Sequence, residues 1–259
     1  MLDKALEHIV PGRTLRLGPF SSMRDPRESH DWRIIGGGYV PEEQPDQHKQ
    51  DDLHRWLEFT LAINELKSRV KVLSLTRDDP TERDAGSAVF GRGFAHPRLW
   101  EQYADNHRGV CLCFDSEKLI DRLAARLPGV DHGAVSYIDA EIASQALFAG
   151  ADELRELGVT AALSNHVREH LDELFFTKLK DWETEMEYRF VVQTDHPEPI
   201  FVKVKSALRA LILGADVSHF YEPAFAKVCD PFGIEIFYMR WIHGRPHLAP
   251  RYDQPAPPS

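Results

Sequence analysis

The chain has few cysteines and no long apolar run. Its three cysteines, Cys111, Cys113 and Cys229, form no even disulfide framework, and the first two alternate within an apolar segment. That pattern is typical of small core residues in a reducing compartment. No segment approaches the roughly 20 apolar residues of a membrane-spanning helix, and residues 1–12 lack the apolar stretch of a secretory signal. We therefore expect a cytoplasmic protein with no membrane partner.

Positive charge is also scarce. Lys and Arg number 31 against 41 Asp and Glu, which gives a formal net charge of −10 at pH 7. Binding to the phosphate backbone of long nucleic acids depends on Lys and Arg that release counterions. The charge balance therefore argues against general binding to nucleic-acid backbones. Binding through a local basic groove is still an alternative.

Length and composition are those of an ordinary globular protein. A chain of 259 residues can bury a substantial core without disulfides or metals. We expect a single domain over residues 1–249. The proline-rich end, residues 250–259, lacks apolar periodicity and is predicted to be a disordered tail.

Apolar periodicity predicts an α+β fold, in which a helical middle region packs on a small, largely antiparallel sheet or on split sheets. A glycine-rich stretch at residues 34–39 is expected to be a loop, because no phosphate-binding Lys-Ser/Thr pair follows it. Helices are expected at residues 51–70, 97–106, 115–127, most of 140–179 with a break near Gly158, and 220–228. Strands are expected at residues 70–75, 110–114, 134–138, 188–193, 200–204, 208–213 and 234–241.

An aromatic and histidine pattern precedes the predicted strand at residues 110–114. Trp100, Tyr103 and His107 are spaced i, i+3 and i+7, so a helix would project all three from one face, beside a turn at Gly109. Such a face could stack a planar ring and hydrogen-bond it. The same stripe would also serve a helix that simply packs on a sheet, and the spacing leaves both interpretations open.

A charged pattern lies further along the chain. Lys178 and Trp182 precede Glu185, Glu187 and Arg189. If residues 185–192 form a strand, its period of two places these three charged residues on one face and the apolar residues between them on the other. That face is either a solvated one that protects a sheet edge, or part of a cleft in which two close carboxylates differ in pKa. In the cleft, Arg189 would bind a phosphate or hold a carboxylate ionised.

A metal-site pattern occurs once. His166 and His170, with Glu169 between them, match the H-x-x-E-H arrangement of a zinc peptidase on a predicted helix. Three fixed positions arise easily in a chain with 13 histidines, and no G-x-S-x-G serine-hydrolase turn is present. We therefore favour a solvated helix face here and expect no metal.

Together, the aromatic and charged patterns resemble a bacterial family, the domain of unknown function numbered 2971. The resemblance covers about residues 15–214. The family's early Asn-Asp-Pro-aromatic-Glu loop is represented here by Arg24, Asp25, Pro26, Arg27 and Glu28, which keep only the Asp-Pro and the acid. The matching positions are Trp100, Tyr103, Ala104, His107, Gly109, Phe114, Asp115, Lys178, Trp182, Glu185, Glu187 and Arg189.

The Glu-x-Glu pair is also similar to the catalytic motif of ADP-ribosyltransferases, which bind NAD between small sheets. This resemblance implies that Glu187 is catalytic, holding a ribose hydroxyl and steadying an oxocarbenium-like transition state. It implies that Glu185 orients the acceptor, a protein or a nucleic acid. The remaining residues expected to bind the nucleotide are Trp100 or Tyr103 for stacking, Arg16 or Arg24 for a phosphate, and His107, Lys178 and Arg189.

Three functions remain in view. The leading hypothesis is an NAD-using ADP-ribosyltransferase-like enzyme or NAD hydrolase, acting as a stress or phage-defence effector. The second is a non-catalytic module that binds a nucleotide or a protein. The third is a metal-dependent phosphodiesterase or nuclease using Glu185, Glu187 and Asp115, which the acidic net charge disfavours for long nucleic acids.

Overall fold

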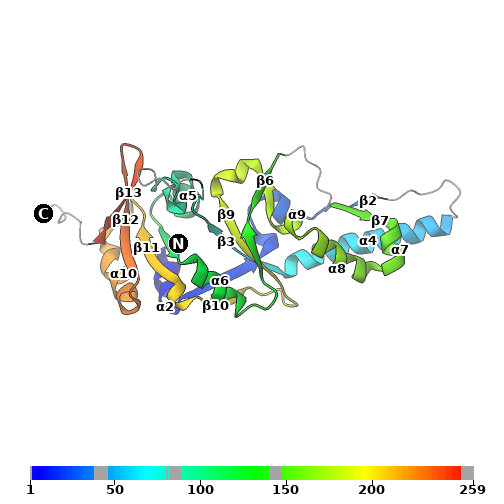
Figure 1. Cartoon of the computed structure of the whole chain (residues 1–259), viewed down its shortest axis with the longest axis horizontal. Helices are drawn as coiled ribbons and strands as arrows, with labels where there is room; N and C mark the ends of the chain where they lie inside the picture. The colour runs from blue at the N-terminus through cyan, green and yellow to red at the C-terminus, as the bar shows by residue number, and fades with distance from the viewer. Residues whose placement is uncertain (1, 38–45, 80, 82–88, 140–146, 252–259) are drawn as a thin grey trace.

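The computed structural model describes residues 2–37, 46–79, 81, 89–139 and 147–251. Figure 1 shows an elongated molecule in which the two larger sheets lie side by side, and helices α4 (Asp46–Arg69), α7 (Ala151–Leu157) and α8 (Val159–Glu169) extend away from one of them. The expected α+β class is confirmed. Within the described residues, no helix combines the length and apolar character needed to cross a membrane.

The first sheet has five strands in the order β10-β1-β3-β9-β5, and every neighbouring pair is antiparallel. The predicted strands at residues 70–75, 188–193 and 200–204 are confirmed here within one or two residues. The strands are β10 (Ile200–Lys203), β1 (Thr14–Pro19), β3 (Val70–Thr76), β9 (Glu187–Gln193) and β5 (Asp131–Ala134).

The second sheet has four strands in the order β13-β12-β11-β4. Strands β11 and β12 are parallel and are connected through helix α10 (Glu222–Cys229), while the outer pairs are antiparallel. The sequence pattern did not predict β13, because its Arg-Pro-His start has little strand propensity. The strands are β13 (Arg245–Pro250), β12 (Glu235–Ile242), β11 (Leu208–Leu213) and β4 (Val110–Phe114).

Two small parallel pairs correct the sequence predictions. Strand β2 (Ile35–Gly37) pairs with β7 (Phe148–Gly150), so the expected loop at residues 34–39 was wrong over β2; residues 38 and 39 lie outside the described part. The single strand expected at residues 134–138 is two strands. β5 ends at Ala134, and β6 (Ser136–Ile138) joins β8 (Thr177–Leu179) in a different sheet.

The predicted helices are mostly confirmed. Gly158 has a φ of 74° and separates α7 from α8, as its position in the sequence suggested. The helical region expected over residues 140–179 is shorter, because β7 and β8 bound it, and residues 140–146 lie outside the described part. The remaining longer helices are α5 (Pro97–Tyr103), α6 (Ser116–Ala124), capped by Asp115, and α9 (Leu171–Phe175).

Helices cover both faces of each sheet. Leu119 and Leu123 of α6, four residues apart on one helix face, pack on one side of the five-stranded sheet. Residues of α4, α8 and α9 cover the other side, with Phe59 and Phe175 fully buried among them. On the four-stranded sheet, Phe225 of α10 packs on one face, and α5 covers the other.

The first two residues of the predicted C-terminal tail belong to the described fold. Pro250 is the last residue of β13 and pairs with Phe237, and Arg251 forms an ion pair with Asp230, 2.9 Å from Nη1 to Oδ1. The rest of the expected tail, residues 252–259, lies outside the described part.

Candidate functional site

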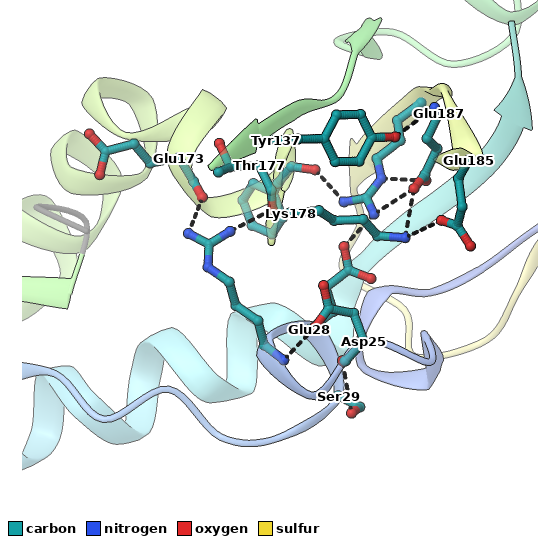
Figure 2. A network of polar contacts seen from close by, with 12 residues as sticks. Asp25, Glu28, Ser29, Tyr137, Glu173, Thr177, Lys178, Glu185 and Glu187 are labelled. Atoms are coloured by element: carbon teal, nitrogen blue, oxygen red, sulfur yellow. Dashed lines mark hydrogen bonds and ion pairs between the residues drawn. The ribbon is translucent and has the colours of Figure 1, made fainter. Parts of the chain in front are cut away.

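Five buried charged residues form one network, which we call the ion network, where β8, β9 and helix α3 (Pro26–Ser29) meet (Figure 2). None of the five is more than 7% exposed. Charged groups are rarely buried to this extent unless they are paired. The network therefore needs a complete account of its contacts. Its members are Glu28, Lys178, Glu185, Glu187 and Arg189.

Arg189 is fully buried on β9 and contacts two carboxylates of the network. Its Nε is 2.5 Å from Glu187 Oε1, its Nη1 donates to the carbonyl oxygen of Phe175 at 2.7 Å, and its Nη2 donates to Glu28. Burial alone would lower the pKa of Arg189, but the two carboxylates raise it. The guanidinium is committed to the protein and holds two carboxylates in place.

Lys178, on β8, joins the two glutamates of the Glu-x-Glu pair. Its Nζ lies 2.8 Å from Glu185 Oε2 and 2.8 Å from Glu187 Oε2. Burial would lower the pKa of Lys178, but the negative charges of Glu187 and Glu28 raise it. The ammonium also lies 4.9 Å from the centre of the Trp182 ring, a cation–π contact.

The two glutamates differ in their surroundings. Burial would raise the pKa of Glu187, but hydrogen bonds and charge from Arg189 and Lys178 outweigh it and lower the pKa. Glu187 is the first residue of β9, whereas Glu185 ends the 3-10 helix η5 (Lys180–Glu185). Met186 between them has a φ of 45°. Residues 185–192 therefore do not form a single strand, because the backbone is not extended before Glu187. The prediction that one strand face carries all three charged residues depended on such a strand.

Tyr103 connects α5 to the network. Its hydroxyl donates a hydrogen bond to Glu185 Oε1. Burial and the bond to Glu185 raise the pKa of Tyr103, so the phenol keeps its proton. The exposed Arg24 guanidinium lies 5.0 Å from the centre of the Tyr103 ring. Tyr103 and Arg24, both expected at the site, thus lie together beside Glu185.

A pocket of about 460 Å³ opens beside the network, and we call it the Glu185 pocket. Of the ion network, only Glu185 lines it, so Glu187 and Arg189 lie behind this wall. Arg27 also lines it, but its guanidinium donates to the carbonyl oxygens of Thr177 and Glu173, at 2.5 and 2.6 Å. The full lining is Asp25, Pro26, Arg27, Arg98, Gln102, Leu179, Asp181, Trp182, Thr184 and Glu185.

Trp100 and His107 lie elsewhere. Trp100 is 3% exposed and packs against the four-stranded sheet, with its Nε1 donating to the carbonyl oxygen of Phe94 at 2.7 Å. His107 stacks on Trp100 and accepts a hydrogen bond from Trp241 Nε1 at 3.3 Å. Helix α5 ends at Tyr103, and His107 has a φ of 64°, so the expected single face is broken. Only Tyr103 of the three contacts the ion network.

Three other sequence candidates also lie apart from the Glu185 pocket. Arg16 is exposed on β1, opposite Phe201 of β10, and no contact among the described residues joins it to the ion network. Asp115 caps α6 and pairs with Lys118, 3.0 Å from Nζ to Oδ2. His166 is buried, so the expected solvated helix face was wrong at this position, where the ring packs edge-on against Phe59. Within the described residues, no three His, Cys, Asp or Glu side chains are placed to hold a metal ion.

Sequence reasoning missed the roles of Asp25 and Glu28. Asp25 caps α3, with Oδ1 accepting from the backbone N of Arg27 at 2.9 Å, and Asp-Pro before a short helix is a pattern that indicates such a cap. Glu28 is 1% exposed, and burial raises its pKa to about 6 despite the charge of Arg189. Tyr137, whose hydroxyl accepts from the backbone N of Glu187 at 2.8 Å, lies in no recognisable pattern.

Comparison with known proteins bears on the segment that carries most of this geometry. No curated protein and no solved structure matches the chain. Residues 99–190 match the model of a family described as a protein of unknown function, DUF2971. The matched segment includes Tyr103, Lys178, Glu185, Glu187 and Arg189. Over this segment, the chain is therefore similar to the DUF2971 family, whose description names no activity.

Proposed function

We propose that the Glu185 pocket binds NAD and that Glu185 promotes cleavage of its N-glycosidic bond, as in an ADP-ribosyltransferase-like enzyme or an NAD hydrolase. One observation carries this proposal. Glu185 lines a pocket, and Lys178 and Tyr103 hold the two oxygens of its carboxylate. A fixed carboxylate beside a developing positive charge stabilises the transition state without having to reorganise.

The pocket wall suits a nucleotide. Its volume of about 460 Å³ is within the range of small-molecule sites. Trp182 is half-buried and offers an aromatic surface to a planar ring. Arg98 is exposed on the wall, and Arg24 lies over the neighbouring Tyr103, so two guanidinium groups stand near the pocket for phosphate oxygens.

The proposed reaction is a substitution at the anomeric carbon of the nicotinamide ribose. The bond from this carbon to the pyridinium nitrogen breaks, and nicotinamide leaves as a neutral molecule with the bonding electron pair. The Glu185 carboxylate faces the resulting oxocarbenium-like carbon. A water or acceptor nucleophile then attacks that carbon and gives up its proton to Glu185 or to solvent. Water makes the protein a hydrolase, and an acceptor on a protein or nucleic acid makes it a transferase.

The two glutamates take different parts in this proposal. The resemblance to ADP-ribosyltransferases implied that Glu187 is the catalytic carboxylate. The contacts favour Glu185 for that part, because Glu187 is engaged by Arg189 and Lys178 behind the pocket wall. Glu187 then acts as a positioning residue, which holds Lys178 against Glu185. Consumption of NAD would suit the expected role as a stress or phage-defence effector.

A second candidate is a non-catalytic nucleotide-binding module. The observation in its favour is that Arg189, Lys178 and Glu187 are paired with one another and with neighbouring groups, as in a structural network. Purified protein incubated with NAD, followed for nicotinamide release and for NAD binding, separates the two. Release supports the enzyme, and binding without release under any acceptor condition supports the module. If the protein neither binds NAD nor releases nicotinamide, both candidate functions are contradicted.

Asp181→Asn supplies a matched control for this experiment. Asp181 lines the same pocket but is exposed, and no contact among the described residues joins it to the ion network. We expect this variant to release nicotinamide at the wild-type rate. If Asp181→Asn releases nicotinamide at the wild-type rate and substitution of Glu185 abolishes release, the chemistry depends on the Glu185 carboxylate. The overall negative charge of the pocket lining would then not explain it.

A further inference from the structure

Helix α4 carries apolar side chains on two sides. Phe59 and Ile63 face the core and are buried. A second row, which we call the leucine ridge, consists of Leu53, Leu57 and Leu61, which are 56%, 47% and 73% exposed. With 3.6 residues per turn, this ridge lies about 140° around the helix from the side that faces the core. A surface helix needs only one apolar side to pack on its own fold, so the second side calls for an explanation.

The neighbouring helices do not cover the leucine ridge. Helices α7 and α8 pack along α4, and the N-terminal part of α4 lies at the end of the molecule opposite the four-stranded sheet (Figure 1). The three leucines keep their exposure in the presence of these neighbours. The ridge is therefore open to contact from outside the described fold.

Charged residues continue the ridge at both ends. Lys49 lies four residues before the first leucine, and Glu65 lies four residues after the last one. Both are exposed, and Glu65 also pairs with Arg69 of the same helix, an exposed contact of little strength. The row of five side chains at spacing i+4 thus has its apolar part centred on Leu57, with opposite charges at equal distances from that centre.

This arrangement is complementary to itself. A symmetric dimer uses the same patch on both copies, so each residue must suit the one that it meets across the two-fold axis. If two α4 helices cross antiparallel at Leu57, Leu53 of one copy lies opposite Leu61 of the other, and Lys49 lies opposite Glu65. A parallel alignment would instead bring like charges together. Rows of residues four apart are also the ridges that interlock in the commonest packing of two helices.

We propose that two copies of this chain associate through the leucine ridge, with their α4 helices antiparallel and crossing at Leu57. The proposal does not depend on the proposed function. Three leucines from each copy make a small contact, and interfaces below about 1,200 Å² in total belong to weak or transient complexes. We therefore expect a dimer that dissociates on dilution.

The first test measures the oligomeric state. Sedimentation velocity of the full chain from about 1 µM to about 1 mM should show a monomer that becomes a dimer as the concentration rises. Leu57→Glu places two carboxylates on the two-fold axis and should raise the dissociation constant about 100-fold or more. Ile242→Glu is the matched control, because Ile242 is 46% exposed on β12 of the other large sheet. The control should dimerise as the wild-type protein does.

The second test exchanges the charges. Lys49→Glu makes both ends of the ridge acidic, and Glu65→Lys makes both ends basic. Each variant alone should dimerise about tenfold more weakly than the wild-type protein. An equal mixture of the two should recover the wild-type amount of dimer, because opposite charges meet again at both ends. Dimerisation that the mixture does not recover would overturn the antiparallel alignment.

The other occupants of the ridge give different results. A wild-type protein that stays monomeric over the whole concentration range would overturn the proposal. If, in addition, Leu57→Glu lowered the free energy of unfolding measured in urea while Ile242→Glu did not, another part of the same chain would cover the ridge. A dimer that survives Leu57→Glu would place the contact between copies on another face and would also overturn the proposal.

Discussion

The hydroxyl of Tyr103 donates a hydrogen bond to Glu185 across 82 positions of sequence. This contact joins α5, which packs on the four-stranded sheet, to the turn that precedes β9 of the five-stranded sheet. Lys178 holds the other oxygen of the same carboxylate. The site therefore depends on the way the two sheets are placed beside each other.

The first prediction concerns this hydrogen bond. Tyr103→Phe removes one donor from Glu185 and keeps the ring, so nicotinamide release should fall by about tenfold, since one hydrogen bond to a charged group is lost. The assay is the initial rate of release at saturating NAD. Tyr188→Phe is the control, because that hydroxyl contacts His132, 2.7 Å from its Nδ1, outside the ion network. Equal rates in the two variants would contradict the role of Tyr103.

The second prediction concerns the stability of the ion network. Arg189→Met leaves Glu28 and Glu187 buried without their main partner, and should lower the free energy of unfolding by about 3–5 kcal/mol. Arg69→Met removes an exposed pair with Glu65 and should cost less than about 1 kcal/mol. Urea denaturation measures both. Similar costs for the two substitutions would show that the buried pairing is not needed.

The third prediction concerns pH. Burial raises the pKa of Glu28 from an ordinary 4.5 to about 6. The positive charges of Arg189 and Lys178 lower this pKa, and the negative charge of Glu187 raises it, but burial has the largest effect. The folded protein then holds this proton more tightly than the unfolded chain, so the Glu28 contribution to stability declines as pH rises from about 4.5 to about 6. The decline should be about 2 kcal/mol.

Glu28→Gln removes this titration. The difference in unfolding free energy between the wild-type and Glu28→Gln proteins should therefore shift in favour of the variant as pH rises through this window. Urea denaturation at several pH values measures the difference. A difference that is independent of pH would mean that Glu28 has an ordinary pKa in the folded protein.

The fourth prediction separates two tryptophans. Trp182→Ala should weaken NAD binding by about tenfold or more, because base–aromatic stacking is lost from the pocket wall. Trp100→Ala should instead cost about 3–5 kcal/mol of stability, because Trp100 is buried in the core. Calorimetry and urea denaturation distinguish these effects. If Trp100→Ala folds stably and binds NAD more weakly while Trp182→Ala binds it normally, the nucleotide does not bind in the Glu185 pocket.

Local sequence patterns predicted much of the fold, but not the positions of its short strands. Periodicity located α4, β4 and β11, because each has an apolar pattern of its own. The pairs β2-β7 and β6-β8 join segments that are far apart along the chain, whereas β13 forms a hairpin with β12, which directly precedes it. Their propensities are weak, so tertiary contacts decide their structure.

The site was predictable only for residues that belong to one local sequence pattern. The Lys178 to Arg189 pattern identified four members of the ion network, although alternation on one strand accounts only for Glu187 and Arg189. The separation of Tyr103 from His107 was not predictable, since it depends on the end of α5 and on the left-handed backbone at His107. The burial of Glu28 against Arg189 spans 161 positions and has no local pattern.

Nicotinamide release by the wild-type, Glu185→Gln and Glu187→Gln proteins tests the central claim most directly. Glu185 lies on the pocket wall, so Glu185→Gln should reduce the release rate by about 100-fold or more while NAD still binds. Glu187→Gln should mainly lower stability, with a smaller loss of rate in the folded protein. A wild-type rate of release from Glu185→Gln, or no release and no NAD binding by the wild-type protein, would contradict the account.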